Sequence, residues 1–178
     1  MKRYPAIDER LKAFVEAQPV YFVGTASEGA RISVSPKGID SFRVLGSNRV
    51  AYADMTGATN EAAAHLQRDG RITILFCSFT RNANIVRIYG QGRIVLPSDP
   101  DWEAVAAIMP QPPGLRHFID VTVDEVIDNC GYGVPEMTLV RERPTLTAWS
   151  EQKGEDGLRA YRQEKNNISI DGLPIEVE

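Results

Sequence analysis

The chain is dominated by short runs rich in β-branched and aromatic residues, with turn signals between them. Turn-forming pairs such as Glu28-Gly29 and Lys37-Gly38 separate consecutive runs. Short strands at close spacing, joined by tight turns, are typical of antiparallel sheets. The runs are residues 20–25, 31–35, 42–45, 49–55, 71–79, 85–96 and 117–126. This pattern predicts an antiparallel meander that is closed or nearly closed.

Helical patterns flank and interrupt these runs. Leu11, Phe14 and Val15 lie on one helical stripe, and Asp8 is placed to cap its start. Further helices are expected at 60–69, from Ser98 or Asp99 onward, and at 145–153 and 155–164 around Gly154. The sequence therefore predicts a main domain over residues 1–144. Residues 145–178 form a helical tail that is too short for its own core and packs on the barrel or on a partner subunit.

Composition excludes several classes of function. The net charge of −4 over 178 residues disfavours sequence-independent nucleic-acid binding, which needs a dense basic face. No stretch reaches the ~20 apolar residues of a membrane span, and the charged start does not read as a signal peptide. We expect a cytoplasmic protein in which Cys77 and Cys130 are buried free thiols. No zinc-ligand spacing is present, and no metal is expected.

Two neighbouring segments could hold an anion. Alternation over residues 31–37 places Ser33, Ser35 and Lys37 on one strand face and the apolar residues, including Val34, on the other. Two hydroxyls and an ammonium in one row suit a phosphate, although a solvated face of a half-buried strand gives the same pattern. The loop 56–60 leads into a helix start, whose free amides favour anions, while capping by Thr59 or Asn60 is the plainer interpretation.

Other residues give weaker signals. Arg87 shares a strand face with Tyr89 and could reach a phosphate or a carboxylate, or lie at the surface. Tyr132 stands between two glycines in a loop and suits stacking on a planar ligand, or plugging the core. His65 is expected at the surface of its helix. No general base or nucleophile is predicted, so the catalytic residues stay unknown.

An ordered series of motifs resembles the FMN-binding split barrels related to pyridoxamine 5′-phosphate oxidase. The motifs are Ser35-Pro36-Lys37-Gly38, Thr56-Gly57 with Asn60-Glu61, Cys130-Gly131-Tyr132-Gly133-Val134-Pro135 and Ser169-Ile170-Asp171-Gly172-Leu173-Pro174. The last two resemble one subgroup of the family whose reaction is not settled. The resemblance implies a mainly β (α+β) fold: a six-stranded antiparallel split β-barrel with flanking helices, working as a homodimer with FMN at the subunit interface.

The resemblance also implies cofactor-binding residues. Ser33, Val34 and Ser35 correspond to the strand that lines the flavin ring and ribityl chain, and Lys37 to the lysine on the phosphate side. Thr59, Asn60 and Glu61 correspond to the helix start that holds the phosphate in the oxidases, and Arg87 to a position near the ring edge. Tyr132 and Trp149 are candidates for contacts from the second subunit.

The chain departs from the oxidases at positions that matter for the reaction. Basic residues of the oxidases are replaced by Ile32 or Ser33 and by Glu61 or Ala62, and the substrate-gripping Arg and His of the C-terminal segment are absent. A vitamin-pathway oxidase is therefore not expected. We expect an FMN-dependent oxidoreductase with a small-molecule substrate. The alternatives are a non-catalytic flavin-binding or stress-related module, and a binder of a deazaflavin or haem-related ligand.

Overall fold

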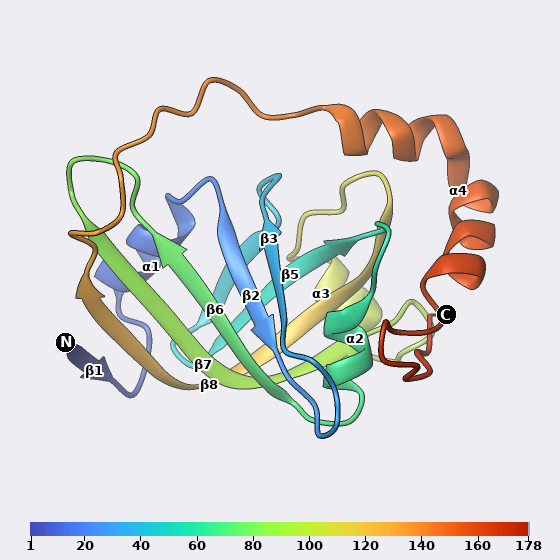
Figure 1. Ribbon diagram of the computed structural model, residues 1–178, viewed down its shortest axis with the longest axis horizontal. Helices are drawn as coiled ribbons and strands as arrows, with labels where there is room; N and C mark the ends of the chain where they lie inside the picture. The colour runs from blue at the N-terminus through green and yellow to red at the C-terminus, as the bar shows by residue number, and fades with distance from the viewer. Residues whose placement is uncertain (178) are drawn as a thin grey trace.

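The fold is built on one antiparallel sheet. The computed structural model describes residues 1–177, and within them eight strands pair in the order β3-β2-β6-β7-β8-β5-β4, with β1 beside β8 (Figure 1). The strands are β1 (Lys2–Tyr4), β2 (Tyr21–Thr25), β3 (Ser33–Lys37), β4 (Phe42–Gly46), β5 (Arg49–Met55), β6 (Arg71–Cys77), β7 (Asn84–Val95) and β8 (Leu115–Cys130).

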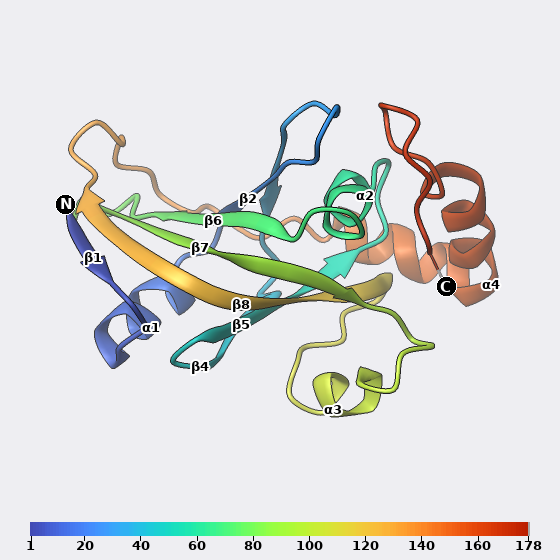
Figure 2. The same ribbon diagram turned by 90° about the horizontal axis from the view of Figure 1, so that it is seen from below.

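The mainly β, antiparallel prediction is confirmed, but the strand count and the closure differ. Each of the seven runs identified in the sequence overlaps a strand. The eighth strand, β1, has three residues, too few for a pattern to reveal it. In the described part of the chain the strand order is open: β3 and β4 are its two edges and do not pair. Figure 2 shows the long strands β7 and β8 curving along the molecule.

A register shift marks the pairing of β7 with β8. It falls between Tyr89 and Gly90. A Cβ atom at Gly90 would lie 2.2 Å from the carbonyl oxygen of Thr122, so only glycine permits this close approach. The alternation along β7 leaves Arg87 partly exposed and Gly90 buried, which matches the expected faces.

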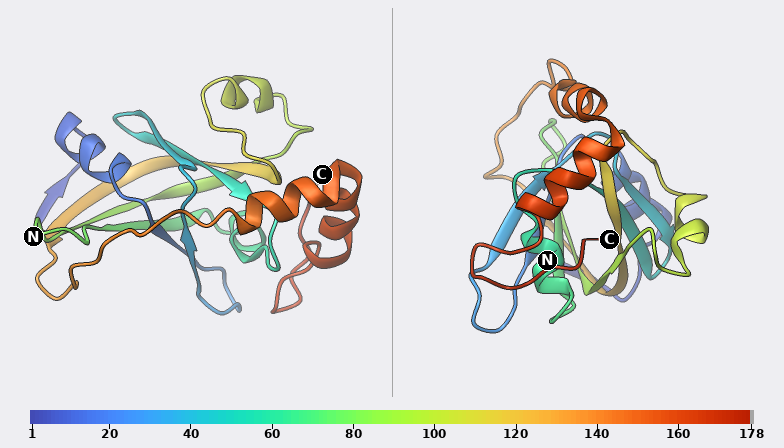
Figure 3. Two further views of the ribbon diagram at one scale, coloured as in Figure 1. Left: turned by 90° about the horizontal axis from the view of Figure 1, so that it is seen from above. Right: turned by 90° about the vertical axis from the view of Figure 1, so that its right-hand side faces the viewer.

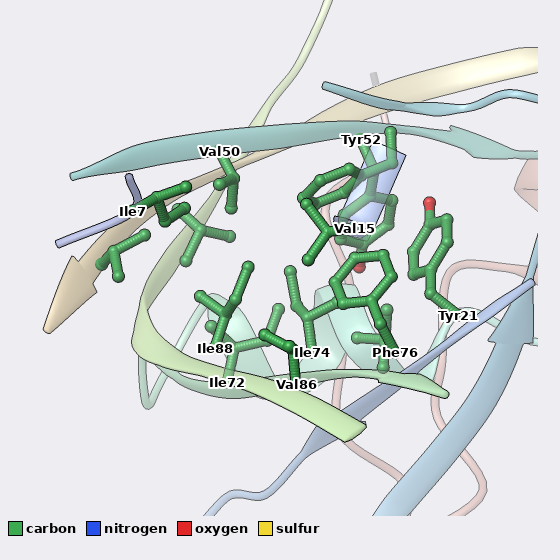
Figure 4. Close-up of a cluster of buried hydrophobic side chains, with 14 of the residues drawn as sticks. Ile7, Val15, Tyr21, Val50, Tyr52, Ile72, Ile74, Phe76, Val86 and Ile88 are labelled. Carbon is green, nitrogen blue, oxygen red and sulfur yellow. The ribbon is translucent and has the colours of Figure 1, made fainter. Parts of the chain in front are cut away.

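The main core lies on the concave side of the sheet and is rich in aromatic rings (Figure 4). Tyr21 stacks on Phe76 with ring centroids 5.4 Å apart, and Phe42 meets Phe76 edge-on at 4.9 Å. The hydroxyl of Tyr21 forms a hydrogen bond with Ser41 Oγ at 2.8 Å. Ser41 leads into β4 and Tyr21 belongs to β2, so the aromatic cluster joins segments from both halves of the sheet.

Four helices flank the sheet in the described residues. They are α1 (Glu9–Glu16), α2 (Glu61–Leu66), α3 (Trp102–Ala106) and α4 (Thr145–Lys165). Asp8 caps α1 as expected, since its Oδ1 accepts a hydrogen bond from the backbone N–H of Leu11 at 2.7 Å. Helix α3 begins later than predicted because Asp99 Oδ2 accepts from the N–H of Leu96, which keeps residues 96–99 in a turn.

The C-terminal tail contacts the loop before α2 within the same chain. Gly154 has φ 65° and ψ 172°, which is not helical, so α4 consists of two helices that meet at a kink at this residue, as expected. Asn166, which ends α4, donates through Nδ2 to the carbonyl oxygen of Gly57 at 2.9 Å. Figure 3 shows α4 and the C-terminus beside α2. The proposed domain division at residues 144 and 145 stays a prediction.

The state of the two cysteines can be compared with the expectation from the sequence. Both cysteines are free, and Cys77 is buried as expected, but Cys130 is exposed because β8 ends there at the rim of the sheet. Across residues 1–177 no helix is both long and apolar enough to cross a membrane, and no cluster of side chains could hold a metal ion.

Candidate functional site

A fully buried carboxylate organises the polar interior of the protein. Asp54 lies on β5 and is 0% exposed. Its Oδ2 accepts from Arg116 Nε at 3.0 Å and from Arg116 Nη2 at 2.8 Å, while its Oδ1 pairs with Lys37 Nζ. His117 Nε2 lies 3.2 Å from Oδ2, at an angle that does not make a hydrogen bond. We call Lys37, Asp54, Arg116 and His117 the Asp54 cluster.

The Asp54 cluster connects five segments of the chain: β3, β5, β8, the loop before α2 and the end of α4. Besides Asp54, Arg116 reaches the loop before α2 and the end of α4: its Nη1 donates to the carbonyl oxygen of Thr59 at 2.9 Å and to Asn166 Oδ1 at 3.0 Å. Lys37 brings in β3. Lys37 on β3 is therefore connected to the loop 56–60 through Asp54 and Arg116.

The charges of the cluster sum to a positive value. Burial by itself raises the pKa of the Asp54 carboxyl, but the positive charges of Arg116 and Lys37 outweigh burial and hold this pKa well below its ordinary value. Burial lowers the pKa of His117, and nearby Asp54 only partly offsets that effect. At neutral pH, Asp54 is thus ionised and His117 is neutral. Two cations then face one anion, which leaves one positive charge.

Lys37 is the member of the cluster that faces a cavity. Its side chain is 19% exposed and lines a cavity of about 690 Å³. The opposite wall comes from the strap, by which we mean the extended segment 131–144, and from the start of α4 with Trp149. In Figure 1 the strap crosses above the sheet from the end of β8 to α4. Arg141 and Arg143 of the strap also line this cavity, together with Glu142.

Lys37 and Trp149 are therefore brought together, within one chain. Trp149 meets Tyr161 edge-on, with ring centroids 5.2 Å apart, which fixes the indole at the cavity. The expectation that Trp149 reaches a second subunit stays a prediction. Tyr132 is 86% exposed and also stays a candidate for such a contact.

The polar row on β3 points inward. In an antiparallel pair opposite residues share a face, and Ser33, Ser35 and Lys37 pair with the buried residues Thr25, Val23 and Tyr21. The row therefore shares the face of the core residues of β2, and its three members are half-buried. The apolar residues of the strand point outward instead: Val34 is 66% exposed and Ile32 is 77% exposed.

The start of α2, residues 59–61, does not line the cavity that contains Lys37. Thr59 is exposed, and the side chain of Asn60 makes no capping bond, so capping does not explain this residue. Asn60 Nδ2 points to the carbonyl oxygen of Asn166 at 3.4 Å, and its buried Oδ1 has no partner within residues 1–177. Glu61 accepts from the N–H of Ile170 at 3.0 Å and so holds the C-terminal loop.

Arg87 and His65 also have defined places. Arg87 lies on the outer face of β7, opposite Leu75 and Ile127, away from the Asp54 cluster. His65 is fully buried, contrary to expectation, because α2 packs against β2 and the ring Nδ1 forms a hydrogen bond with Thr25 Oγ1 at 3.0 Å.

The donor set fits a phosphate-bearing aromatic cofactor in part. An ammonium carries three donors, so Lys37 can bind Asp54 and still address an anion in the cavity. Trp149 offers a ring face, and about 690 Å³ lies within the usual range of roughly 300–1,000 Å³ for ligand sites. The described contacts of these three residues are with Arg116 and the C-terminal tail: the carbonyl oxygen of Thr59 accepts from Arg116, Asn60 Nδ2 donates to Asn166, and Glu61 accepts from Ile170. The assignment of Thr59, Asn60 and Glu61 to the cofactor phosphate stays a prediction.

Sequence reasoning gave no role to Asp54, Arg116, His117 or Asn166. One signal was available: Asp54 is a lone charge inside the apolar run 50–55, and Arg116-His117 open another such run. A charge in a buried strand requires a partner. The identity of that partner depends on the pairing of β5 with β8, which places Asp54 opposite His117.

Comparison with known proteins agrees with this fold. A curated relative from Aspergillus flavus, the pyridoxamine 5′-phosphate oxidase family protein ustO, is 34% identical over 191 residues, which cover 96% of this chain and 76% of the relative. A solved structure of a candidate pyridoxamine 5′-phosphate oxidase from Lactobacillus delbrueckii covers 71% of this chain and 99% of its own, with a TM-score of 0.57 and 19% identity. HupZ from Group A Streptococcus covers 74% of this chain and 99% of its own, with a TM-score of 0.55 and 17% identity.

The family model of pyridoxamine 5′-phosphate oxidase matches residues 7–130. This range runs from the start of α1 to the end of β8 and includes all of the Asp54 cluster, whereas the strap and α4 lie beyond it. The sheet, the matched range and the curated relative lead to one conclusion: the chain belongs to the pyridoxamine 5′-phosphate oxidase family.

Proposed function

We propose that this protein is an FMN-dependent oxidoreductase that acts on a small molecule and works as a homodimer in the cytoplasm. The observation that carries the proposal is the cavity of about 690 Å³ that is lined by both Lys37 and Trp149. It combines a half-buried cation, an aromatic ring and room for a planar cofactor in a chain whose family is named for a flavin enzyme.

In this proposal the residues of the chain bind and orient the cofactor. Lys37, held by Asp54, supplies positive charge for the phosphate, and Trp149 supplies a surface for the ring. Arg141 and Arg143 add positive charge along the open side of the cavity. FMN itself, when bound, supplies the capacity to accept a hydride from a substrate, so the protein needs no general base for that step.

The homodimer is supported by the outward row of β3. Ile32 and Val34 are exposed on an edge strand, and a second copy of the chain would cover them. Exposed apolar residues gathered on one face are typical of interaction sites.

The first experiment is the visible absorption spectrum of the purified protein, followed by release and identification of any chromophore. We expect flavin bands and free FMN. A deazaflavin or haem spectrum would replace the FMN assignment, and a colourless protein that binds no added FMN would refute it. Reduction of bound flavin by NADH or NADPH and reoxidation in air would distinguish an enzyme from a flavin-holding module.

A substitution tests the role of Lys37. Lys37→Ala should weaken FMN binding by about 1–3 kcal/mol, the usual value of a hydrogen bond to a charged group. Titration of flavin fluorescence measures this affinity. Lys2→Ala, which removes an exposed lysine from β1, is the matched control and should bind FMN like the wild type. Unchanged affinity in Lys37→Ala would remove this lysine from the site.

A further inference from the structure

A second cavity, of about 500 Å³, lies beside the first. Its walls come from the end of α1, the β6–β7 turn and the middle of the strap, through residues such as Phe14, Phe79 and Val140. The strap is fixed here by a backbone hydrogen bond from the N–H of Met137 to the carbonyl oxygen of Phe79, at 2.8 Å. The second cavity is thus bordered by anchored chain.

The two cavities share a wall. Pro19, Val20 and Leu139 line both of them. A molecule in the second cavity would therefore lie next to one bound beside Lys37 and Trp149. A reaction between a bound cofactor and a substrate requires that their reacting groups be held close together, and a substrate site that borders the cofactor site is the arrangement that allows it.

The lining of the second cavity carries no charge. Among the described residues that line it, none is ionisable. The polar side chains are neutral hydroxyls and amides, and several already have partners: Ser78 Oγ is 2.9 Å from Thr80 Oγ1, and Gln18 Nε2 donates to the carbonyl oxygen of Phe14 at 2.8 Å. The first cavity, in contrast, has Lys37, Arg141, Glu142 and Arg143 in its walls.

We propose that the second cavity is the substrate pocket and that it takes uncharged, largely apolar small molecules rather than phosphorylated or carboxylated ones. This inference rests on the proposed function, since it assigns the first cavity to the cofactor. An anion would lose its hydration in the second cavity and gain no counter-charge, which is costly. An apolar molecule gains from burial against Phe14, Phe79 and Leu139.

The test compares two probes that share a ring system and differ in charge. 1-Naphthol, neutral at pH 7, and 1-naphthyl phosphate are titrated into the protein as purified with its cofactor, with probe fluorescence as the readout. Val140→Asp and, independently, Met137→Asp place a carboxylate at the cavity. Both residues are largely exposed, so the substitutions spare the core. Ile108→Asp, at an exposed residue that lines neither cavity, is the control.

We expect saturable binding of 1-naphthol and at least tenfold weaker binding of 1-naphthyl phosphate. Each strap variant should weaken 1-naphthol binding about tenfold, because the bound ring would cover a carboxylate that is hydrated in the free protein, and removing water from a charge is costly. Binding of 1-naphthol to the Ile108→Asp control, and the FMN affinity of all variants, should stay unchanged. Equal affinity for the phosphate probe would overturn the substrate class. Normal 1-naphthol binding in both strap variants would overturn the pocket. Absence of FMN binding in the wild type would instead refute the proposed function, and is measured separately.

Discussion

Replacing Asp54 by Asn tests whether the Asp54 cluster holds the fold together. The substitution keeps the shape of the side chain and removes its charge. Arg116, whose side chain is only 5% exposed, would then keep a buried charge without its anion. Loss of one partner from a buried ion pair costs about 3–5 kcal/mol. Lys37 adds less, because its partly exposed ammonium can turn toward water.

The expected change in melting temperature follows from that free energy. For a domain of this size, 1 kcal/mol corresponds to roughly 2–4 °C, so Asp54→Asn should melt roughly 6–20 °C below the wild type. Urea unfolding followed by tryptophan fluorescence measures the free energy of unfolding directly. Arg116→Met should be destabilised similarly, and the double variant by less than the sum, because the second substitution removes the charge that the first leaves unpaired.

Asp120→Asn is the matched control. Asp120 lies on β8 and pairs with Arg49 and Arg93, whose side chains are 46% and 49% exposed. These arginines can regain water, so the control should lose at most about 1 kcal/mol. Equal, small losses in Asp54→Asn and Asp120→Asn would refute the reasoning.

The pH dependence gives a second check on Asp54. A carboxyl whose pKa is lowered in the folded protein stabilises the fold above its unfolded-state pKa, and this contribution is lost as the pH falls through the folded-state value. The pKa of Asp54 is lowered in this way. The difference in stability between the wild type and Asp54→Asn should therefore shrink as the pH falls below about 4.

Two further predictions concern His117 and the subunit interface. The pKa of His117 is lowered by burial, so the unfolded state binds a proton first; the stability of the wild type should fall as the pH drops below about 6.5. His117→Gln should lose this part of the pH dependence, as measured by melting between pH 7.5 and 5, and an unchanged slope would contradict it. Val34→Lys should convert the proposed homodimer to a monomer in analytical ultracentrifugation, whereas Ile108→Lys, at another exposed residue, should leave the proposed homodimer intact. A dimeric Val34→Lys would exclude the β3 edge from the proposed interface.

The fold was largely predictable because its strands are short and separated by turn signals. The predicted Asp8 cap forms, and the two helices expected around Gly154 form and meet at a kink. Alternation on β3 also separated Ser33, Ser35 and Lys37 from Val34 correctly. It could not tell which face is inward, because on an edge strand either row can be covered. Only the pairing of β3 with β2 places the polar row inside.

The Asp54 cluster was beyond local reasoning because its members are far apart in sequence. Asp54 and Arg116 are separated by 62 residues, and Arg116 and Asn166 by 50. No periodicity spans such distances. His65 shows the same limit in reverse: its place on a short helix suggested a surface residue, whereas β2 covers it and Thr25 binds its ring. Burial that depends on tertiary packing cannot be predicted from the local sequence.

The distribution of charge also explains why the chain departs from the oxidases where it does. Glu61 or Ala62 stands where the oxidases carry a cation at the helix start. The carboxylate of Glu61 accepts a hydrogen bond from the backbone N–H of Ile170 in the C-terminal loop. Positive charge is gathered instead around Lys37, Arg141 and Arg143, at one cavity, while the adjoining cavity has neutral walls. If the cofactor phosphate occupies the cavity with Lys37, the adjoining cavity offers a phosphorylated substrate no counter-charge among its lining residues, and a neutral substrate is the one that this pair of cavities favours.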